Sequence, residues 1–261
     1  MNVFPRELET MRILLTNDDG IDAPGLKAMA RIAATLSKDI WVCAPEVQQS
    51  GAGHSLTLSD PVRLNRHSKR RFSTNGTPTD CVLLALHRIM KDQPPDLVLS
   101  GVNMGGNMGE DITYSGTVAA AMEATLLRVP AIALSLQLRD GPRHVHWATA
   151  EIHAPDIITK LCRAGWPRGT LININFPGVA SEEIAGIEVT AQGQRFIGDN
   201  LHERTDPRGR TYFWIGRLQN LSKPKKGTDL AAIEADRISV TPIHLDFTHH
   251  RAIKPLREAL S

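Results

Sequence analysis

The chain has 261 residues, with 30 lysines and arginines against 28 aspartates and glutamates and a formal net charge of +2. This length suits one α/β domain with a single core, and the mixture of charges along the sequence argues against binding to a nucleic-acid polymer. No apolar run approaches the roughly 20 residues of a membrane-spanning helix. The three cysteines lack the spacing of a metal site, so we expect a soluble, cytoplasmic protein.

The first half of the chain alternates strand and helix patterns, as βαβ units do. Residues 1–10 carry no leader pattern and are expected to form a loose extension. Continuous apolar runs predict strands, and apolar stripes at helical spacing predict helices. The strands are expected over 12–16, 40–44, 96–101, 131–136 and 171–176, and the helices over 24–33, 79–90, 115–127 and 146–163. Apolar strands between helices predict a three-layer α/β fold with a mostly parallel sheet.

The pattern changes after about Pro177. The stretches GIEVTAQG and RTYFWIGRL alternate as exposed or hairpin strands do, and a charged loop interrupted by proline follows at 222–229. RISVTPI predicts a further strand, and 252–260 a short terminal helix. We therefore divide the chain into a core over 11–180 and a C-terminal part of the same domain over 181–261, with strands, a hairpin arm and the terminal helix.

Polar residues follow the predicted strands at one edge of the sheet, where open parallel sheets bind ligands. Asp18 and Asp19 follow the first strand, Ser50 lies in the loop after the second, and Asn103 follows the third. An isolated Asp-Asp-Gly is more often a solvated turn or helix cap, and Ser50 alone suits a turn hydroxyl equally well. Together, these oxygen donors favour one divalent cation, either Mg²⁺, Mn²⁺ or Ca²⁺.

The loop GVNMGGNMGEDITYSGT is rich in glycine but does not match the dinucleotide-binding pattern GxGxxG. Its end is more informative, because Ser115, Gly116 and Thr117 open a helix, and free N–H groups at a helix N-terminus favour an anion. Asn107 is a further neutral donor. We expect these four residues to bind a phosphate, although Ser115 also suits a plain helix cap and Asn107 a turn.

Other polar or aromatic residues give weaker indications. His54, in the glycine-containing loop near the crevice, is a candidate acid or substrate contact but is more often a structural histidine. The pair His249 and His250 has no third ligand nearby and is expected to be a surface turn. Tyr212, Phe213 and Trp214 are most simply explained as packing of the arm.

These motifs, taken together, closely resemble those of the SurE family, the stationary-phase survival protein E nucleotidases. The resemblance begins at MRILLTNDDGIDAPGL, continues through VCAPEVQQSGAGHSLT, NGTPTDCVLLAL, PDLVLSGVNMGGNMGEDITYSGTVAAAMEA and PAIALSL, and ends at DPRGRTYFWIG, GTDLAAI and ISVTPIHLDFT. It implies a Rossmann-like core with a swapped C-terminal arm, homodimers or homotetramers, and metal-dependent removal of phosphate from nucleoside 5′- and 3′-monophosphates, in some members also from short polyphosphate.

Carried onto this sequence, the family's metal ligands fall on Asp18, Asp19, Ser50 and Asn103, and its phosphate contacts on Asn107, Ser115, Gly116 and Thr117. The ten-residue N-terminal extension, the basic SKPKK loop and the C-terminal tail depart from the family pattern, and these departures bear on assembly and not on chemistry.

The sequence therefore predicts a metal-dependent phosphomonoesterase, a 5′-nucleotidase, in which Asp18 and Asp19 are catalytic. Two routes stay open at this point: attack by water deprotonated by Asp18 or Asp19, and a phospho-aspartate intermediate. An alternative function is a non-catalytic nucleotide sensor that uses the same metal site. Haloacid-dehalogenase phosphatases need D-x-D-x-[TV], which DDGID does not supply, and a P-loop is absent from the sequence.

Overall fold

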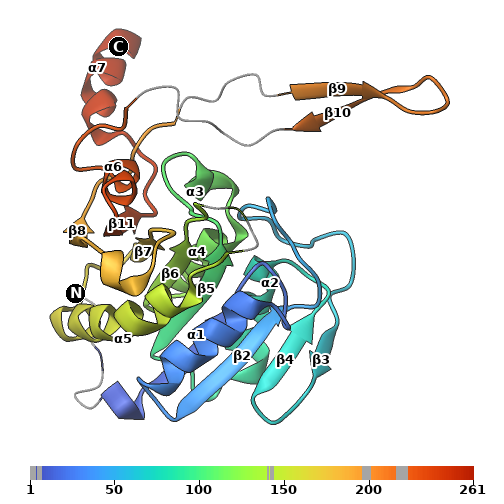
Figure 1. The fold of residues 1–261 in the computed structure, drawn as a ribbon, viewed down its shortest axis with the longest axis vertical. Coiled ribbons are helices and arrows are strands. Elements are labelled where there is room, and N and C mark those ends of the chain that lie inside the picture. The colour runs from blue at the N-terminus through green and yellow to red at the C-terminus, as the bar shows by residue number, and fades with distance from the viewer. Residues whose placement is uncertain (1–3, 5–7, 140, 142–143, 196–200, 216–222) are drawn as a thin grey trace.

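The computed structural model describes residue 4 and residues 8–139, 141, 144–195, 201–215 and 223–261. A nine-stranded sheet forms its centre (Figure 1). In spatial order, its strands are β3 (Leu64–Arg66), β4 (Arg71–Thr74), β2 (Asp39–Pro45), β1 (Arg12–Thr16), β5 (Leu97–Met104), β6 (Ala131–Leu136), β7 (Thr170–Phe176), β11 (Arg237–His244) and β8 (Gly186–Val189).

The strands from β4 to β7 all run parallel to one another, whereas β3 and β11 run antiparallel to their neighbours β4 and β7. The predicted mostly parallel sheet is therefore confirmed. The five runs read as core strands are all present, because strands covered on both faces need a continuous apolar sequence.

Helices cover both faces of the sheet. The helices are α1 (Pro24–Ala34), α2 (Pro78–Leu84), α3 (Asp111–Tyr114), α4 (Gly116–Leu126), α5 (Trp147–Ala164), α6 (Asp229–Glu234) and α7 (His250–Leu260), with single turns η1 (Leu8–Thr10), η2 (Ala85–Ile89) and η3 (Ser181–Glu183). Alternate residues of β1 show the two layers. Ile13 and Leu15 pack in the core beneath α1 and α5, and Leu14 packs in the core beneath α2 and α4.

Some elements differ from the expectation. The helix expected over 79–90 ends at Leu84 and continues as the π-helical turn η2. Its start is fixed by a capping box, in which the Thr77 hydroxyl accepts from the Asp80 N–H and the Asp80 carboxylate accepts from the Thr77 N–H. The short helix α6 was not predicted, because its six residues are too few for a periodic apolar stripe.

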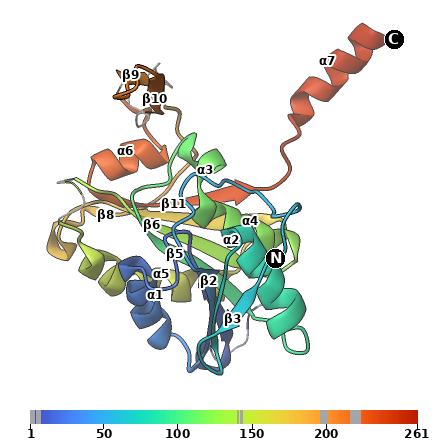
Figure 2. The same cartoon turned by 90° about the vertical axis from the view of Figure 1, so that its right-hand side faces the viewer.

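The C-terminal part both completes the sheet and extends from it. β11 and β8 belong to the main sheet, so the sheet continues across the boundary that we set at residue 180. The hairpin of β9 (Leu201–Thr205) and β10 (Thr211–Ile215) projects from the body as an arm (Figure 1). Helix α7 also projects (Figure 2). Within the described part of the chain, no helix combines the length and the apolar character that a membrane crossing requires.

Of the extension expected over residues 1–10, residues 1–3 and 5–7 lie outside the described part. Phe4 packs against Trp166, with ring centroids 5.0 Å apart, and residues 8–10 form the turn η1.

Candidate active site

The polar loops meet where the topology of a parallel sheet favours a ligand. β1 lies between β2 and β5, so the chain leaves β1 toward one side and later returns on the other, which opens a crevice at the carboxyl ends of these strands. A cleft of about 860 Å³ occupies this position. Six of the eight predicted site residues line it: Asp18, Asp19, Ser50, Asn103, Asn107 and Ser115.

The two adjacent carboxylates follow β1 directly. Asp18 is buried, and burial raises its pKa to about 6; repulsion from Asp19 adds to the rise, and hydrogen bonds from Thr117 partly offset it. Burial also raises the pKa of Asp19, and the backbone N–H of Met104, 3.4 Å from Asp19 Oδ2, opposes that rise. Both carboxylates thus lie in surroundings that disfavour their negative charge.

Thr117 and Gly116 lie behind Asp18 and do not line the cleft. The Thr117 hydroxyl donates a short hydrogen bond to Asp18 Oδ1, and its side chain is fully buried. The phosphate contact of Thr117 stays a prediction; in this structure its hydroxyl supports the Asp18 carboxylate. A Cβ on Gly116 would lie 2.8 Å from Cβ of Asp18, so only glycine lets the helix approach this closely.

Ser50 and Asn103 each have a side-chain oxygen with an acceptor site that is open to a ligand in the cleft. The Asn103 amide nitrogen donates to the carbonyl of Gly105 at 2.8 Å, which orients the side chain, and no hydrogen bond among the described residues engages its Oδ1. The Ser50 hydroxyl accepts from the Gln48 amide nitrogen at 2.8 Å and has a second lone pair. The loop that carries Ser50 is tied to the first strand by the N–H of Gln49, which donates to the Asp18 carbonyl at 2.7 Å.

Asn107 is held by a buried polar network on β7 and β6. Asn175 accepts from the Asn107 N–H at 2.8 Å and donates to its carbonyl at 3.1 Å, and Asn173 donates to the same carbonyl at 2.8 Å. The Asn107 amide nitrogen donates to the Ser135 hydroxyl at 2.7 Å. The backbone of Asn107 is therefore fixed on both sides, and its side chain lines the cleft beside the oxygen donors.

The N-terminus of α4 reaches the same cleft through its N-cap residue. Ser115 is its N-cap, with its hydroxyl accepting from the Val118 N–H at 3.1 Å. This start of an eleven-residue helix supplies partial positive charge at the cleft wall, a position that favours an anion.

Some residues that line the cleft were not predicted, namely Gln48, Asp111, Tyr114, Gln137, Leu138, Arg195 and Ile215. Asp111 and Tyr114 belong to α3, which is too short to be read from a pattern. Arg195 arrives from a distant part of the chain, and nothing in its local sequence marks it. The buried network was also missed, although two asparagines inside the apolar strand LININF are a recognisable indication of buried polar partners.

The weaker candidates lie outside the cleft. His54 Nε2 lies 2.9 Å from Oε2 of Glu123, a buried residue of α4, and this pair ties the Ser50 loop to the helix. His250 pairs with Asp246 at 2.7 Å on the surface. Among the described residues, no group of three or more histidines, cysteines or acids is placed to hold a metal. The predicted metal ligands include only two carboxylates, with an amide and a hydroxyl, so they do not form such a group.

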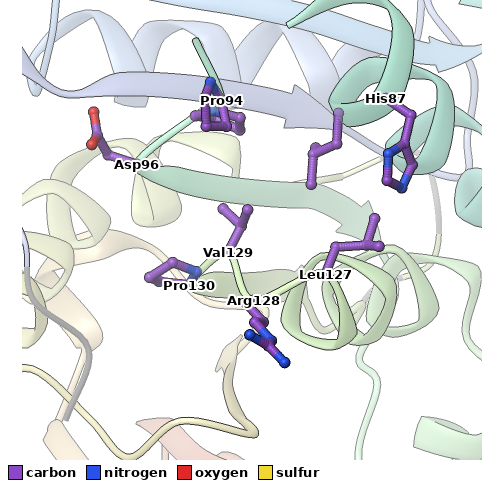
Figure 3. A pocket seen from close by; sticks show the side chains of 9 residues that line it. His87, Pro94, Asp96, Leu127, Arg128, Val129 and Pro130 are labelled. Atoms are coloured by element: carbon purple, nitrogen blue, oxygen red, sulfur yellow. The ribbon is translucent and has the colours of Figure 1, made fainter. Parts of the chain in front are cut away.

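A separate cavity of about 410 Å³ lies at the opposite ends of the strands, before β5 and β6 (Figure 3). Prolines and aliphatic side chains make up much of its lining, which includes Pro94, Val129 and Pro130. Its carboxylate, Asp96, already accepts from the Arg12 N–H at 2.7 Å. None of the predicted site residues lines this cavity, so it is not the candidate active site.

Comparison with known proteins identifies the family. The model of the family described as survival protein SurE matches residues 13–199. The chain is 54% identical to the 5′-nucleotidase SurE of Paramagnetospirillum magneticum, over 96% of each chain. It is 50% identical to the 5′-nucleotidase SurE of Caulobacter vibrioides, again over 96% of each. The crystal structure of the SurE protein from Aquifex aeolicus superposes with a TM-score of 0.83 at 37% identity, covering 96% of this chain and all of that one. The chain belongs to the SurE family.

Proposed function

We propose that this chain is a divalent-metal-dependent 5′-nucleotidase. The observation that carries the proposal is the shared cleft, in which the oxygen donors of Asp18, Asp19, Ser50 and Asn103 face the N-terminus of α4. A cation site beside an anion site is what hydrolysis of a phosphate monoester requires. The name 5′-nucleotidase SurE, carried by relatives about 50% identical over nearly the whole chain, supports the same activity.

The donor set fits a hard divalent cation. Two carboxylates with raised pKa values lie together at one wall, and the Asn103 amide presents a free oxygen. Asp18, Asp19, Ser50 and Asn103 would hold the ion, with oxygen ligands typical of Mg²⁺, Mn²⁺ or Ca²⁺. When bound, the ion would neutralise negative charge that develops on the phosphoryl oxygens.

The chain's own residues then bind and orient the substrate. The Ser115 hydroxyl and the Asn107 amide bind the phosphate oxygens, and the positive end of the α4 dipole at Ser115 favours their negative charge. Asp18 or Asp19 accepts the proton of the attacking water, and the bond from phosphorus to the nucleoside oxygen breaks as the new bond forms. Positioning and charge account for most of the catalysis. In the competing route, one of these carboxylates attacks phosphorus and displaces the nucleoside, and water then hydrolyses the phospho-aspartate to release phosphate.

The size of the cleft supports a broader substrate range. A cavity of about 290 Å³ adjoins the main cleft and shares Gln137, Leu138 and Arg195 with it. The two spaces together have room for a nucleoside beside the phosphate, and 3′-monophosphates and short polyphosphate belong to the proposal as further substrates. The exposed aromatic residues of the arm support self-association as a homodimer or homotetramer.

The test is release of phosphate from nucleoside 5′-monophosphates after treatment with EDTA, with Mg²⁺, Mn²⁺ or Ca²⁺ added back. We expect release to stop with EDTA and to return with at least one ion. The variant Asp19→Asn should lose phosphate release even with saturating metal if the chain is an enzyme that uses this carboxylate. Release near the wild-type rate would contradict the catalytic role of the site. Nucleotide binding without phosphate release by the wild type would favour the sensor, and release that is insensitive to EDTA would contradict the role of the metal.

A further inference from the structure

Arg195 lies in the candidate active site but has no part in the function as proposed so far. It is the only cationic side chain that lines the cleft among the residues that the structure describes. Its side chain is 14% exposed, and it lines the adjoining cavity as well. Arg195 thus lies at the junction of the cleft and the adjoining cavity.

Two contacts hold Arg195 against the loop before α4. Its backbone N–H donates to the Glu110 carboxylate, and its guanidinium Nη2 lies 3.1 Å from Asp111 Oδ2. The carbonyl of Asp111 accepts from the N–H of Ser115 at 3.0 Å. The guanidinium is therefore anchored through a residue that is itself bonded to the N-cap of α4.

The segment that carries Arg195 is fixed independently of these contacts. The Gln192 amide donates to the Gly109 carbonyl at 2.9 Å, and the fully buried Asp229 carboxylate accepts from the N–H groups of Gly193 at 2.7 Å and Gly109 at 2.9 Å. The segment before Arg195 is thus joined to the loop at Gly109 by hydrogen bonds of two side chains, those of Gln192 and Asp229, and such support orders a binding residue.

The charge of the cleft favours a cationic side chain beside the metal ion. Asp18, Asp19 and Asp111 all line it, and a phosphate monoester adds two further negative charges near neutral pH. One divalent ion leaves an excess of negative charge, and Arg195, the one cationic side chain among the described lining residues, reduces that excess. Its ion pair with Asp111 uses one edge of the guanidinium, and Nε has no hydrogen-bond partner within the described part of the chain. Arginine has five donors in a planar fork that suits phosphate oxygens.

We propose that Arg195 is a substrate-binding residue that contacts the phosphate group of the nucleotide. This proposal rests on the proposed function, and it adds a direct contact from the C-terminal part of the chain to the substrate. Asp111 holds the guanidinium in place before substrate binds, and the phosphate adds a second anionic partner on substrate binding.

The test compares Arg195→Met and Arg195→Lys with the wild type in kcat, in KM for a nucleoside 5′-monophosphate, and in the inhibition constant of inorganic phosphate. We expect Arg195→Met to raise both KM and the inhibition constant about tenfold or more, as the loss of a charged hydrogen bond does. Lysine should recover part of this loss. Calorimetry should show Mn²⁺ affinity within about twofold of the wild type, because Arg195 holds no predicted metal ligand.

A matched control and a double variant make the result decisive. Arg237 also pairs with a carboxylate, that of Glu188, but does not line the cleft, so Arg237→Met should keep the wild-type KM. Arg195→Met should raise KM in the Asp111→Asn background by a similar factor. If the effect disappears in that background, Arg195 acts only through its ion pair and the proposal is overturned.

Failure of the proposed function would look different. If the wild type releases no phosphate, the proposed function fails, but calorimetric titration with inorganic phosphate still decides the role of Arg195. Weaker phosphate binding by Arg195→Met than by the wild type would support the contact. Equal binding would overturn it.

Discussion

At the scale of single residues, the burial of Asp18 should lower the free energy of unfolding of the metal-free protein when this carboxylate is ionised. Its pKa rises from 3.8 to about 6, so the folded protein without metal holds this proton more tightly than the unfolded chain does. The free energy of unfolding of the metal-free protein should therefore fall as the pH rises from about 4 to about 6, and stay low above that. Asp18→Asn keeps an acceptor for Thr117 and removes the charge. At pH 8 in EDTA, urea unfolding should show it to be about 3 kcal/mol more stable than the wild type.

The same comparison of the wild type with Asp18→Asn, made with Mn²⁺, provides the control. Bound metal stabilises the wild type by mass action and has a weaker site in Asp18→Asn, so the order of stability should reverse at saturating metal. A variant that is less stable than the wild type at pH 8 in EDTA would show that burial of the charge is not the dominant effect.

The hydroxyl of Thr117 has a separate, testable effect on Asp18. It donates to the ionised carboxylate, so its removal in Thr117→Val should raise the pKa of Asp18 further. Protons then compete more strongly with metal, and calorimetry at pH 6 should show about tenfold weaker Mn²⁺ binding, the loss expected for one charged hydrogen bond. Thr117→Ser keeps the donor and should bind metal nearly as the wild type does. Equal affinities in all three proteins would contradict this role.

At the scale of elements, β7 does more than fill the core. Asn175 satisfies both the N–H and the carbonyl of Asn107, and all of these groups are buried. In Asn175→Ala the N–H of Asn107 loses its partner, which should lower the free energy of unfolding by about 2–3 kcal/mol. Asn65→Ala, at an exposed site on β3, should change it by less than about 0.5 kcal/mol. Denaturant titration of both variants measures the difference, and equal losses would show that the network contributes little.

The elements also show what sequence patterns can predict. The five core strands and the helices between them were predictable because each buries a long, regular apolar pattern, and the rule for strand ends brought Asp18, Ser50 and Asn103 to one edge. The helix α6 and the strand β9 were not, since both are short and β9 is polar. Arg195 was missed for a different reason: it reaches Asp111, 84 positions earlier, only through the tertiary fold.

At the scale of the whole molecule, the arm is unstable on its own. It is a hairpin of two strands, and such a hairpin is marginal in water without a covering surface. In β10, Phe213, Trp214 and Ile215 are 57%, 65% and 87% exposed, and the last of them also lines the cleft. An apolar arm that projects from the body is expected to be covered by a second copy of the chain (Figure 1).

Replacing Phe213 and Trp214 by serine should therefore weaken self-association while the core, which these side chains do not touch, keeps its stability. Light scattering after gel filtration should show a smaller species than the wild type at the same concentration. Arg204→Ala, a polar change on the neighbouring strand β9, should leave the size unchanged. Because Ile215 joins the arm to the cleft wall, the smaller species should also have a higher KM, so loss of assembly and loss of substrate binding should occur together. A monomeric wild type, or a double variant that assembles as the wild type does, would show that these aromatic residues serve another purpose.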